Sequence, residues 1–251
     1  MEWWHPDELK KSEYRVRQID DISLLDNRND FGSYRLLRLK SNTADTAIEC
    51  HNDVKPLNKI RWISKVLNII PTKITSILDA GCGVGFTTGA LAECFYNARV
   101  TGIDISEDAI GYANEKFPKA DFRAQAISPG PDRLGQFDII FCFEFYPFTR
   151  NSDPIVQSRF IQYFADQLSD GGKIVIFQKW ENSLSMSIIL NQVAQLCPGL
   201  VFEIHSIPHP RLPSWLPISI AQFGSKLINF TGRPGMKRFI MVKKVYGSVG
   251  T

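Results

Sequence analysis

One stretch of the sequence decides the fold: Ile77-Leu-Asp-Ala-Gly-Cys-Gly-Val-Gly-Phe86. In it a short apolar run breaks into three glycines at alternate positions, Gly81, Gly83 and Gly85, and a helical pattern follows from Thr87. Glycine is needed where the backbone turns sharply and where a ligand must lie against the main chain with no Cβ in between. The helix that follows presents free N–H groups at its start. The stretch therefore predicts a buried strand, a ligand-binding turn and a helix.

An acidic residue follows this turn at the spacing typical of a ribose-binding carboxylate. Asp104 follows Gly85 by 19 residues, at the end of a strand predicted over 99–105. In nucleotide-binding α/β sheets a carboxylate there accepts hydrogen bonds from both ribose hydroxyls, which indicates an adenosine-type cofactor. A dinucleotide fits less well, because Phe86 stands where its third glycine belongs and Asp79 would repel a pyrophosphate. Asp79 suits a cationic ligand or one that presents an ammonium group.

The rest of the chain alternates between strand and helix patterns. Strands are predicted at 74–80, 99–105, 120–126, 137–143, 173–178, 201–207 and 239–245, and helices at 56–70, 87–95, 107–117, 155–168 and 184–196. Strands separated by helices of this length are typical of a parallel sheet. We expect an α/β fold with a doubly wound, mostly parallel seven-stranded sheet and helices on both faces.

Composition excludes several classes of protein. The chain has 251 residues, 44% of them hydrophobic and 22% charged, which suits one large domain with a sizeable core. No apolar stretch reaches the roughly 18 residues of a membrane helix, so we expect no transmembrane segment. No signal peptide is visible, and the five scattered cysteines predict a cytoplasmic protein with reduced thiols. The spacing of histidines and carboxylates predicts no metal site.

Two local biases qualify the overall composition. Residues 201–251 hold seven basic residues and one acid, Glu203, for a net charge of +6. Such a basic, proline-rich and apolar segment suits an anionic substrate or an acidic lipid surface, unless its charges only solvate strand ends. Seven of the 17 phenylalanines fall between Phe137 and Phe164, at strand and then helix spacing, so we expect most of them in the core.

Three further motifs follow the glycine stretch in order. They are Gly102-Ile-Asp-Ile-Ser106, Phe137-Asp-Ile-Ile-Phe-Cys-Phe-Glu144 and Leu168-Ser-Asp-Gly-Gly-Lys-Ile-Val175. Together with Leu78-Asp-Ala-Gly-Cys-Gly-Val-Gly85 they resemble the motifs of the class I S-adenosylmethionine (SAM)-dependent methyltransferases, over roughly residues 56–245. The resemblance implies SAM as the cofactor and S-adenosylhomocysteine as the product.

The resemblance also implies which residues bind the cofactor. It places Asp79 and the backbone of Gly81 at the amino-acid end of SAM, Asp104 at the ribose diol and Ile105 at the adenine. The acid that often contacts the adenine amino group is missing after the third strand, and Gln125 could accept that hydrogen bond instead. The remaining cofactor-binding residues expected are Gly83, Gly85, Ala126 and Phe143.

Candidates for catalysis come from the same edge of the sheet. Methyl transfer from a sulfonium is an in-line displacement, in which a base is needed only if the acceptor loses a proton. Glu144 matches the family's strand-four acid, but the His that several small-molecule members carry four residues later is Phe148 here. We expect the catalytic residues among Glu144, Tyr146 and His205.

The acceptor is expected to be a small molecule. The Asn-Pro-Pro-Tyr motif of amino-directed nucleic-acid methyltransferases is absent, and Glu144-Phe-Tyr-Pro-Phe148 stands in its place. No nucleic-acid-binding module is recognisable, so we expect no nucleic acid as a partner. The reaction predicted is methylation of an O or N atom on an anionic or sugar- or lipid-linked metabolite. A protein or RNA methyltransferase, or a non-catalytic SAM-binding partner protein, are the alternatives.

The expected layout has three parts. Residues 1–55 form an N-terminal helical lid that helps to bind the substrate, as the family often has, and residues 56–251 form the SAM-binding domain. Within it, the interval 208–236 contains five prolines and is long for a loop in a compact domain, so we expect an insertion that builds the acceptor site. Nothing in the sequence indicates an oligomeric state.

Overall fold

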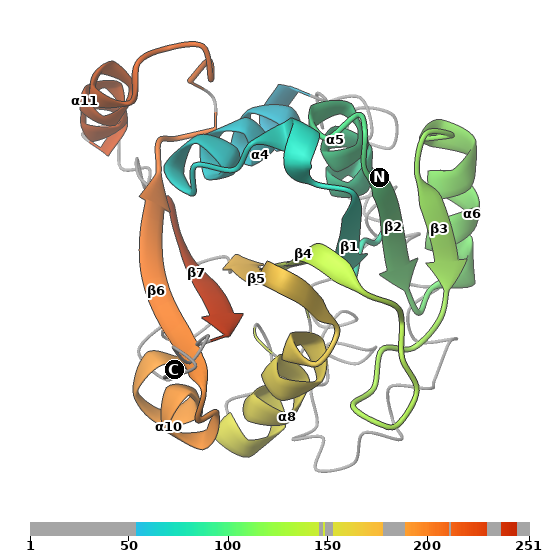
Figure 1. The fold of residues 1–251 in the computed structure, drawn as a ribbon. Helices are drawn as coiled ribbons and strands as arrows, with labels where there is room; N and C mark the ends of the chain where they lie inside the picture. The colour runs from blue at the N-terminus through green and yellow to red at the C-terminus, as the bar shows by residue number, and fades with distance from the viewer. Residues whose placement is uncertain are drawn as a thin grey trace, which may run out of the picture.

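A computed structural model describes residues 54–145, 148, 153–177, 189–210, 212–229 and 237–244. These residues form a seven-stranded sheet in the order β3-β2-β1-β4-β5-β7-β6, shown in Figure 1. The first five strands pair in parallel, and β7 runs antiparallel to both of its neighbours. The predicted doubly wound, mostly parallel α/β sheet is therefore confirmed. The expected lid, residues 1–55, lies outside the described residues except for its last two.

The bounds of the elements agree with the predicted order of strands and helices. The strands are β1 (Ser76–Ala80), β2 (Arg99–Asp104), β3 (Asp121–Ala124), β4 (Phe137–Phe143), β5 (Leu168–Phe177), β6 (Leu200–Ile207) and β7 (Lys237–Lys244). The helices are α4 (Val54–Val66), α5 (Phe86–Cys94), α6 (Glu107–Lys116), α8 (Pro154–Ala165), α10 (Ala194–Leu196) and α11 (Ile218–Asn229), with a 3₁₀ turn at Pro71–Lys73 and a π turn at Ile189–Val193.

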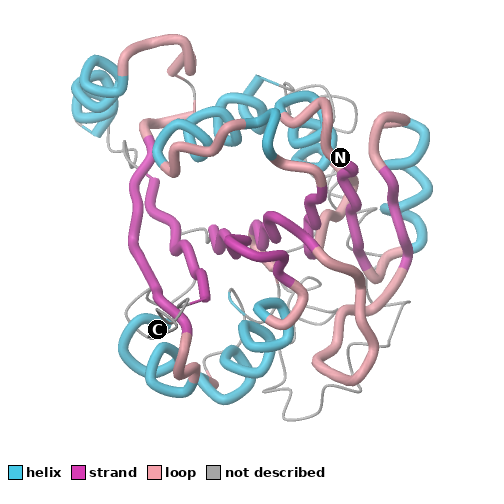
Figure 2. The backbone as a smooth tube through the Cα atoms, in the orientation of Figure 1, coloured by secondary structure: helices cyan, strands magenta, loops and turns pink. Residues whose placement is uncertain are grey.

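Helices cover both faces of the sheet (Figures 1 and 2). Alternate side chains of a strand point to opposite faces, and β4 shows the consequence. Ile139, Phe141 and Phe143 pack with α4 and α5, whereas Ile140 and Cys142 pack with α8. Each face therefore has its own apolar core, and the carboxyl ends of β1, β2 and β4 lie together at one edge.

The helix starts follow from capping chemistry. Ser106 precedes α6, and its hydroxyl accepts a hydrogen bond from the backbone N–H of Ala109 (3.2 Å), as its position in the sequence predicts. Asp153 caps α8 in the same way, by accepting from the N–H of Ile155 (2.8 Å). None of the described helices is long and apolar enough to cross a membrane.

Two helix ends were predicted wrongly. The helix expected over 155–168 ends at Ala165, and Leu168 already pairs with Phe137 as the first residue of β5. The side chain of Gln167 explains this, since its Oε1 accepts from the N–H of Leu134 (2.6 Å) and holds the turn against the sheet. The helix expected to reach residue 70 ends at Val66 instead.

The interval 208–236 is expected from the sequence to be an insertion that builds the acceptor site. It carries α11, which begins directly after Pro217. Figure 1 shows this helix at the upper left, beyond the end of β6. The segment before α11 is fastened to α4, because Trp62 Nε1 donates to the carbonyl of Leu212 (3.1 Å) and Asn58 Nδ2 to that of Pro210 (3.3 Å).

Candidate functional site

The glycine loop after β1 folds back onto the end of β2. The N–H groups of Gly81 and Cys82 both donate to the carbonyl of Ile103, at 2.8 and 3.1 Å. The next N–H, that of Gly83, donates to Oδ2 of Asp104 (2.8 Å). An ammonium group only donates hydrogen bonds, so Gly81 can meet one only through its carbonyl oxygen, which accepts.

The three glycines of the loop differ in the space around them. All have a positive φ, which L side chains rarely adopt. A Cβ at Gly81 would lie 2.8 Å from Phe145, and a Cβ at Gly85 would lie 2.8 Å from the Cβ of Ala113. A Cβ at Gly83 would meet nothing within 4 Å. Gly81 and Gly85 are thus required by packing, while the space beside Gly83 is open.

Asp104 is the last residue of β2, and its side chain links the glycine loop to the start of α6. Its two carboxylate oxygens accept from the backbone N–H of Gly83 (2.8 Å) and of Ser106 (3.0 Å), one each. The half-buried side chain is therefore fixed in place at this edge, with its two carboxylate oxygens acting as hydrogen-bond acceptors.

Asp79 is a buried carboxyl group at the same edge. Its side chain is 1% exposed, and the hydroxyl of Thr88 donates to its Oδ2 (2.7 Å). Burial raises the pKa of Asp79 from 3.8 to about 7, because the charged form loses its hydration. The hydrogen bond from Thr88 and the positive charge of Lys59 lower the pKa, less strongly than burial raises it. A cationic ligand would stabilise the carboxylate further.

Lys59 is a residue of this region that sequence reasoning missed. Its Nζ lies over the rings of Phe143 and Phe177, 4.8 and 4.9 Å from their centroids. Phe143, predicted to bind the cofactor, is buried in this aromatic layer and stacks on Phe141 with 5.3 Å between centroids. Lys59 sits in a helical apolar pattern with no local signal of function, and only the packing of α4 on the sheet brings it here.

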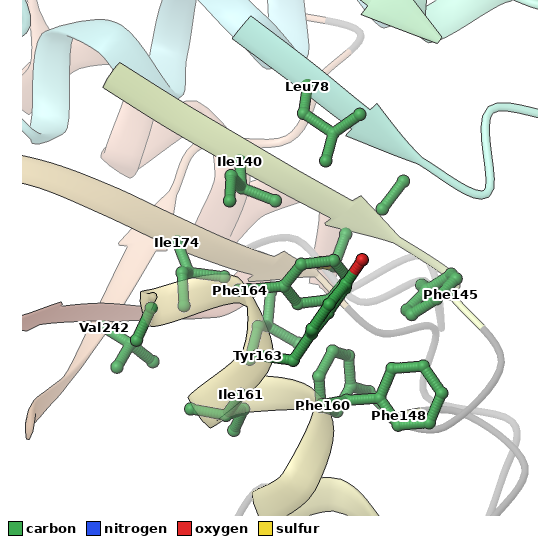
Figure 3. Packing of buried hydrophobic residues seen from close by; sticks show 14 of the residues in the cluster. Leu78, Ile140, Phe145, Phe148, Phe160, Ile161, Tyr163, Phe164, Ile174 and Val242 are labelled. Atoms are coloured by element: carbon green, nitrogen blue, oxygen red, sulfur yellow. The ribbon is translucent and has the colours of Figure 1, made fainter. Parts of the chain in front are cut away.

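The turn after β4 lies beside the glycine loop. Glu144 is half-buried and has a φ of +58°, a left-handed conformation that costs energy for any residue with a Cβ. Phe145 then turns to the α8 side of the sheet, where it packs with Phe160 and Phe164 (Figure 3). Phe148 is fully buried in the same cluster. Tyr146 lies outside the described residues.

The predicted site residues divide into two groups. Gln125 and Ala126 follow β3 directly, and the N–H of Gln125 donates to the carbonyl of Asp104 (2.9 Å), so they lie with Ile105 beside the glycine loop. His205 lies apart on β6, four strand positions from β1, or about 19 Å at about 4.8 Å for each. Its Nε2 is 3.2 Å from Oε2 of Glu203, and its ring stacks on Phe239.

No described residues gather three or more metal-binding side chains.

Residues 77–172 match a family model described as a methyltransferase domain. The match begins at the glycine stretch and runs into β5, so it covers the strands whose ends hold Asp79, Asp104 and Glu144. The strand order and the four motifs agree with it. The chain therefore contains a methyltransferase domain, as its resemblance to the class I SAM-dependent methyltransferases implies.

Two relatives of this methyltransferase carry the name ubiquinone biosynthesis O-methyltransferase. The protein of Bordetella avium is 25% identical over 209 residues, which are 79% of this chain and 81% of the relative. That of Dechloromonas aromatica is 30% identical over 110 residues, 42% of this chain, and the match spans 45% of the relative's length. The fold is similar to the plantazolicin methyltransferase BpumL, with a TM-score of 0.56 at 16% identity, over 90% of this chain and 98% of that one.

The residues at this edge fit SAM, the cofactor that the resemblance implies. SAM combines a ribose diol with an amino-acid end that carries an ammonium group. Asp104 places a carboxylate, the acceptor that hydroxyl groups require, beside the glycine loop, and Asp79 offers a buried carboxyl group whose ionisation a cation would favour. Gly83 leaves the space beside the loop free of side-chain atoms.

Proposed function

We propose that this methyltransferase transfers the methyl group of SAM to an oxygen atom of a small acceptor that has an apolar part and an anionic group. The observation that carries the proposal is a pair of carboxyl groups at one sheet edge: Asp104, held by the glycine loop, and Asp79, held by Thr88 of α5. The names of the relatives, which are O-methyltransferases of ubiquinone biosynthesis, support oxygen as the atom and a small aromatic compound as the acceptor.

In this proposal the cofactor lies along the glycine loop. Asp104 accepts from the ribose hydroxyls, and Asp79 and the carbonyl of Gly81 meet the amino-acid end. Ile105 and Ala126 contact the adenine, and Gln125 accepts from its amino group. Gly83 allows the ligand to approach the backbone, because no side chain stands between. Gly85 contributes by letting α5 start close to α6.

The acceptor lies against α4 and the ends of β4 and β5. Lys59 offers a positive charge above two phenylalanine rings, which suits an aromatic or apolar compound with a carboxylate or phosphate. The segment 208–236, fastened to α4 through Trp62, closes this side. We keep the prediction that residues 1–55, which lie outside the described residues except for the last two, help to bind the acceptor.

The reaction requires two things of the protein: it must align the acceptor with the methyl group, and it must take up one proton from the acceptor. SAM supplies a methyl group on a sulfonium, and the acceptor oxygen displaces the sulfur in line. Glu144 accepts the proton of the acceptor hydroxyl, since it stands at the end of β4 beside the glycine loop and is held in a left-handed conformation. Tyr146 and His205 stay predictions, and the contact of His205 Nε2 with Oε2 of Glu203 (3.2 Å) favours a structural role for His205 at the edge of the sheet.

Cofactor binding is tested first, by calorimetric titration with SAM. Asp104→Asn should weaken the affinity about 10- to 100-fold, the effect of losing hydrogen bonds to a charged group. Asp121→Asn is the matched control, because Asp121 is an exposed carboxylate at the start of β3 that pairs with Arg99 (2.7 Å). Equal affinities of the two variants would refute the ribose assignment.

Turnover is tested with phenolic acceptors that differ only in a carboxylate, by measuring S-adenosylhomocysteine formation. Lys59→Met should raise the KM for the anionic acceptors about tenfold and leave the neutral ones nearly unchanged. Salt-sensitive methylation of protein or RNA alone would favour the macromolecular alternative. SAM binding without turnover of any acceptor would favour a non-catalytic partner protein.

A further inference from the structure

Helix α11 carries a stripe of exposed apolar side chains. Ile220, Phe223 and Leu227 are 56%, 63% and 53% exposed, and their spacing puts them on one side of the helix. Trp215, just before the helix, is 77% exposed. These four side chains are called the α11 stripe below. A soluble surface rarely gathers so many large apolar side chains in one place without a partner.

The stripe is not the side by which α11 joins the fold. The opposite side holds Ala221 and Ser225, both fully buried. The hydroxyl of Ser225 accepts from the N–H of His209 (2.9 Å) and donates to the carbonyl of Ala221 (2.7 Å), which fastens the helix to the segment after β6. Leu212 packs against Gly224 from the same direction. The helix is thus anchored by one face and presents the other outward.

The sequence before and after the stripe carries charge of one sign. Glu203 is the last acidic residue of the chain, and residues 204–242 contain five Lys and Arg. Lys243 and Lys244 lie at the opposite end of β7, where Lys243 pairs with Glu203 (2.6 Å). Lys226 lies within α11 itself, next to Leu227, and Arg211 and Arg233 flank the helix in the sequence. Apolar and aromatic side chains on a helix with basic neighbours are typical of helices that lie in the interface of an anionic bilayer.

The stripe lies at the functional edge of the sheet. β6 runs parallel to β5, since both are antiparallel to β7, so its carboxyl end and α11 lie at the edge where β1, β2 and β4 end. The segment between β6 and α11 is held by α4, the helix that carries Lys59. A surface bound to the stripe would therefore lie beside the candidate acceptor site.

We propose that the α11 stripe docks on the surface of a membrane that contains anionic phospholipids, with Trp215, Phe223 and Leu227 inserted at the level of the headgroups and upper acyl chains. Lys226 and the neighbouring basic residues contact the lipid phosphates. The proposal goes beyond the proposed methyl transfer and does not depend on it, because it concerns a surface formed without cofactor or acceptor.

The test is co-sedimentation with vesicles of phosphatidylcholine mixed with phosphatidylglycerol, and with vesicles of phosphatidylcholine alone, without SAM or acceptor. The full chain should bind the mixed vesicles, more weakly at high salt. The double variant Phe223→Ser/Leu227→Ser should bind them at least about tenfold more weakly, since two inserted side chains are lost. Its melting temperature should equal that of the wild type, because both residues are exposed.

A matched control lies on the other side of the sheet. Ile155 on α8 and Leu196 on α10 are 53% and 49% exposed, so Ile155→Ser/Leu196→Ser removes similar apolar surface away from α11 and should leave vesicle binding unchanged. Brominated phospholipids should quench tryptophan fluorescence in the wild type and less in Trp215→Phe.

Three results would overturn the proposal: no binding to mixed vesicles, equal binding by the two double variants, or quenching that Trp215→Phe leaves intact. A wild-type dimer that Phe223→Ser/Leu227→Ser turns into a monomer, with no vesicle binding, would assign the stripe to a second copy of the chain instead. Loss of methyl transfer with intact vesicle binding would count against the proposed function only.

Discussion

The buried carboxyl group of Asp79 makes stability depend on pH in an unusual direction. In the folded protein its pKa is about 7, against 3.8 as the ordinary value. Between these values the folded state holds a proton that the unfolded chain has lost, so the free energy of unfolding falls as the pH rises from about 4 to 7. The two pKa values differ by about 3, and at about 1.4 kcal/mol for each unit the charged carboxylate costs about 4 kcal/mol above pH 7.

Asp79→Asn removes this cost and adds a smaller one. The amide oxygen can still accept from Thr88, but its NH₂ group is buried at a cost of about 2 kcal/mol. At pH 8 the variant should be more stable than the wild type by about 2 kcal/mol, a rise in melting temperature of about 4–8 °C for a chain of this size. At pH 5 the wild-type carboxyl is protonated in the folded state, and the two proteins should melt at nearly the same temperature.

Differential scanning calorimetry from pH 5 to 8 measures this difference, with Asp121→Asn as the control. Saturating SAM should reverse the order at pH 8, because the ligand stabilises only a protein that binds it tightly and Asp79 is proposed to meet its ammonium group. A variant that is less stable at every pH would refute the reasoning. So would a difference in melting temperature that does not change with pH.

Three further substitutions have expected outcomes. Glu144→Gly should raise the free energy of unfolding by about 1 kcal/mol by relieving the left-handed φ, and should lower the methyl-transfer rate about 100-fold; an unchanged rate in the assay would remove Glu144 as the base. Gly85→Ala should cost about 3 kcal/mol in chemical denaturation and Gly83→Ala only about 1 kcal/mol, because only the former puts a Cβ 2.8 Å from another Cβ; equal costs would contradict this packing. Asp138→Ala should cost about 2 kcal/mol at neutral pH, since Oδ2 accepts from both the N–H and the hydroxyl of Thr75 (2.7 and 2.9 Å). Burial raises the pKa of Asp138, but its hydrogen bonds lower it more, so this stabilisation should disappear as the pH falls through that lowered pKa; a cost that persists in acid would argue against it.

The order of elements was predictable because local patterns agree with the fold. The β4 run from Phe137 to Phe143 is bounded as predicted, and Ser106 caps the helix that its position suggested. Gln167 shows why a local pattern can fail to predict the end of a helix. Its side chain accepts a hydrogen bond from Leu134, 33 residues away, and α8 ends earlier than its apolar periodicity predicts. Helix α11 was not predicted. The prolines before it are typical of a loop, and its buried side consists of small residues, Ala221 and Ser225, which give no apolar periodicity.

The site was predictable where function depends on one segment and unpredictable where it depends on packing between segments. Asp79, Gly83 and Asp104 follow from spacing within two strands and a loop, and the structure brings them together. Lys59 comes from a helix that precedes the glycine stretch, and its place over Phe143 is set by how α4 lies on the sheet. No periodicity in the sequence predicts how α4 packs across the sheet.

The phenylalanine cluster links the core to the chemistry. Phe145 packs against Gly81 on one side and against Phe160 and Phe164 on the other, so the glycine loop rests on the same cluster that fills the space under β4 (Figure 3). Phe148, at the position where several relatives of this class carry a His, is buried in that cluster and offers no proton acceptor. Because the cluster occupies that position, we propose the turn before it as the source of the base. Glu144, held in a left-handed conformation between Phe143 and Phe145, is the described carboxyl group in that turn.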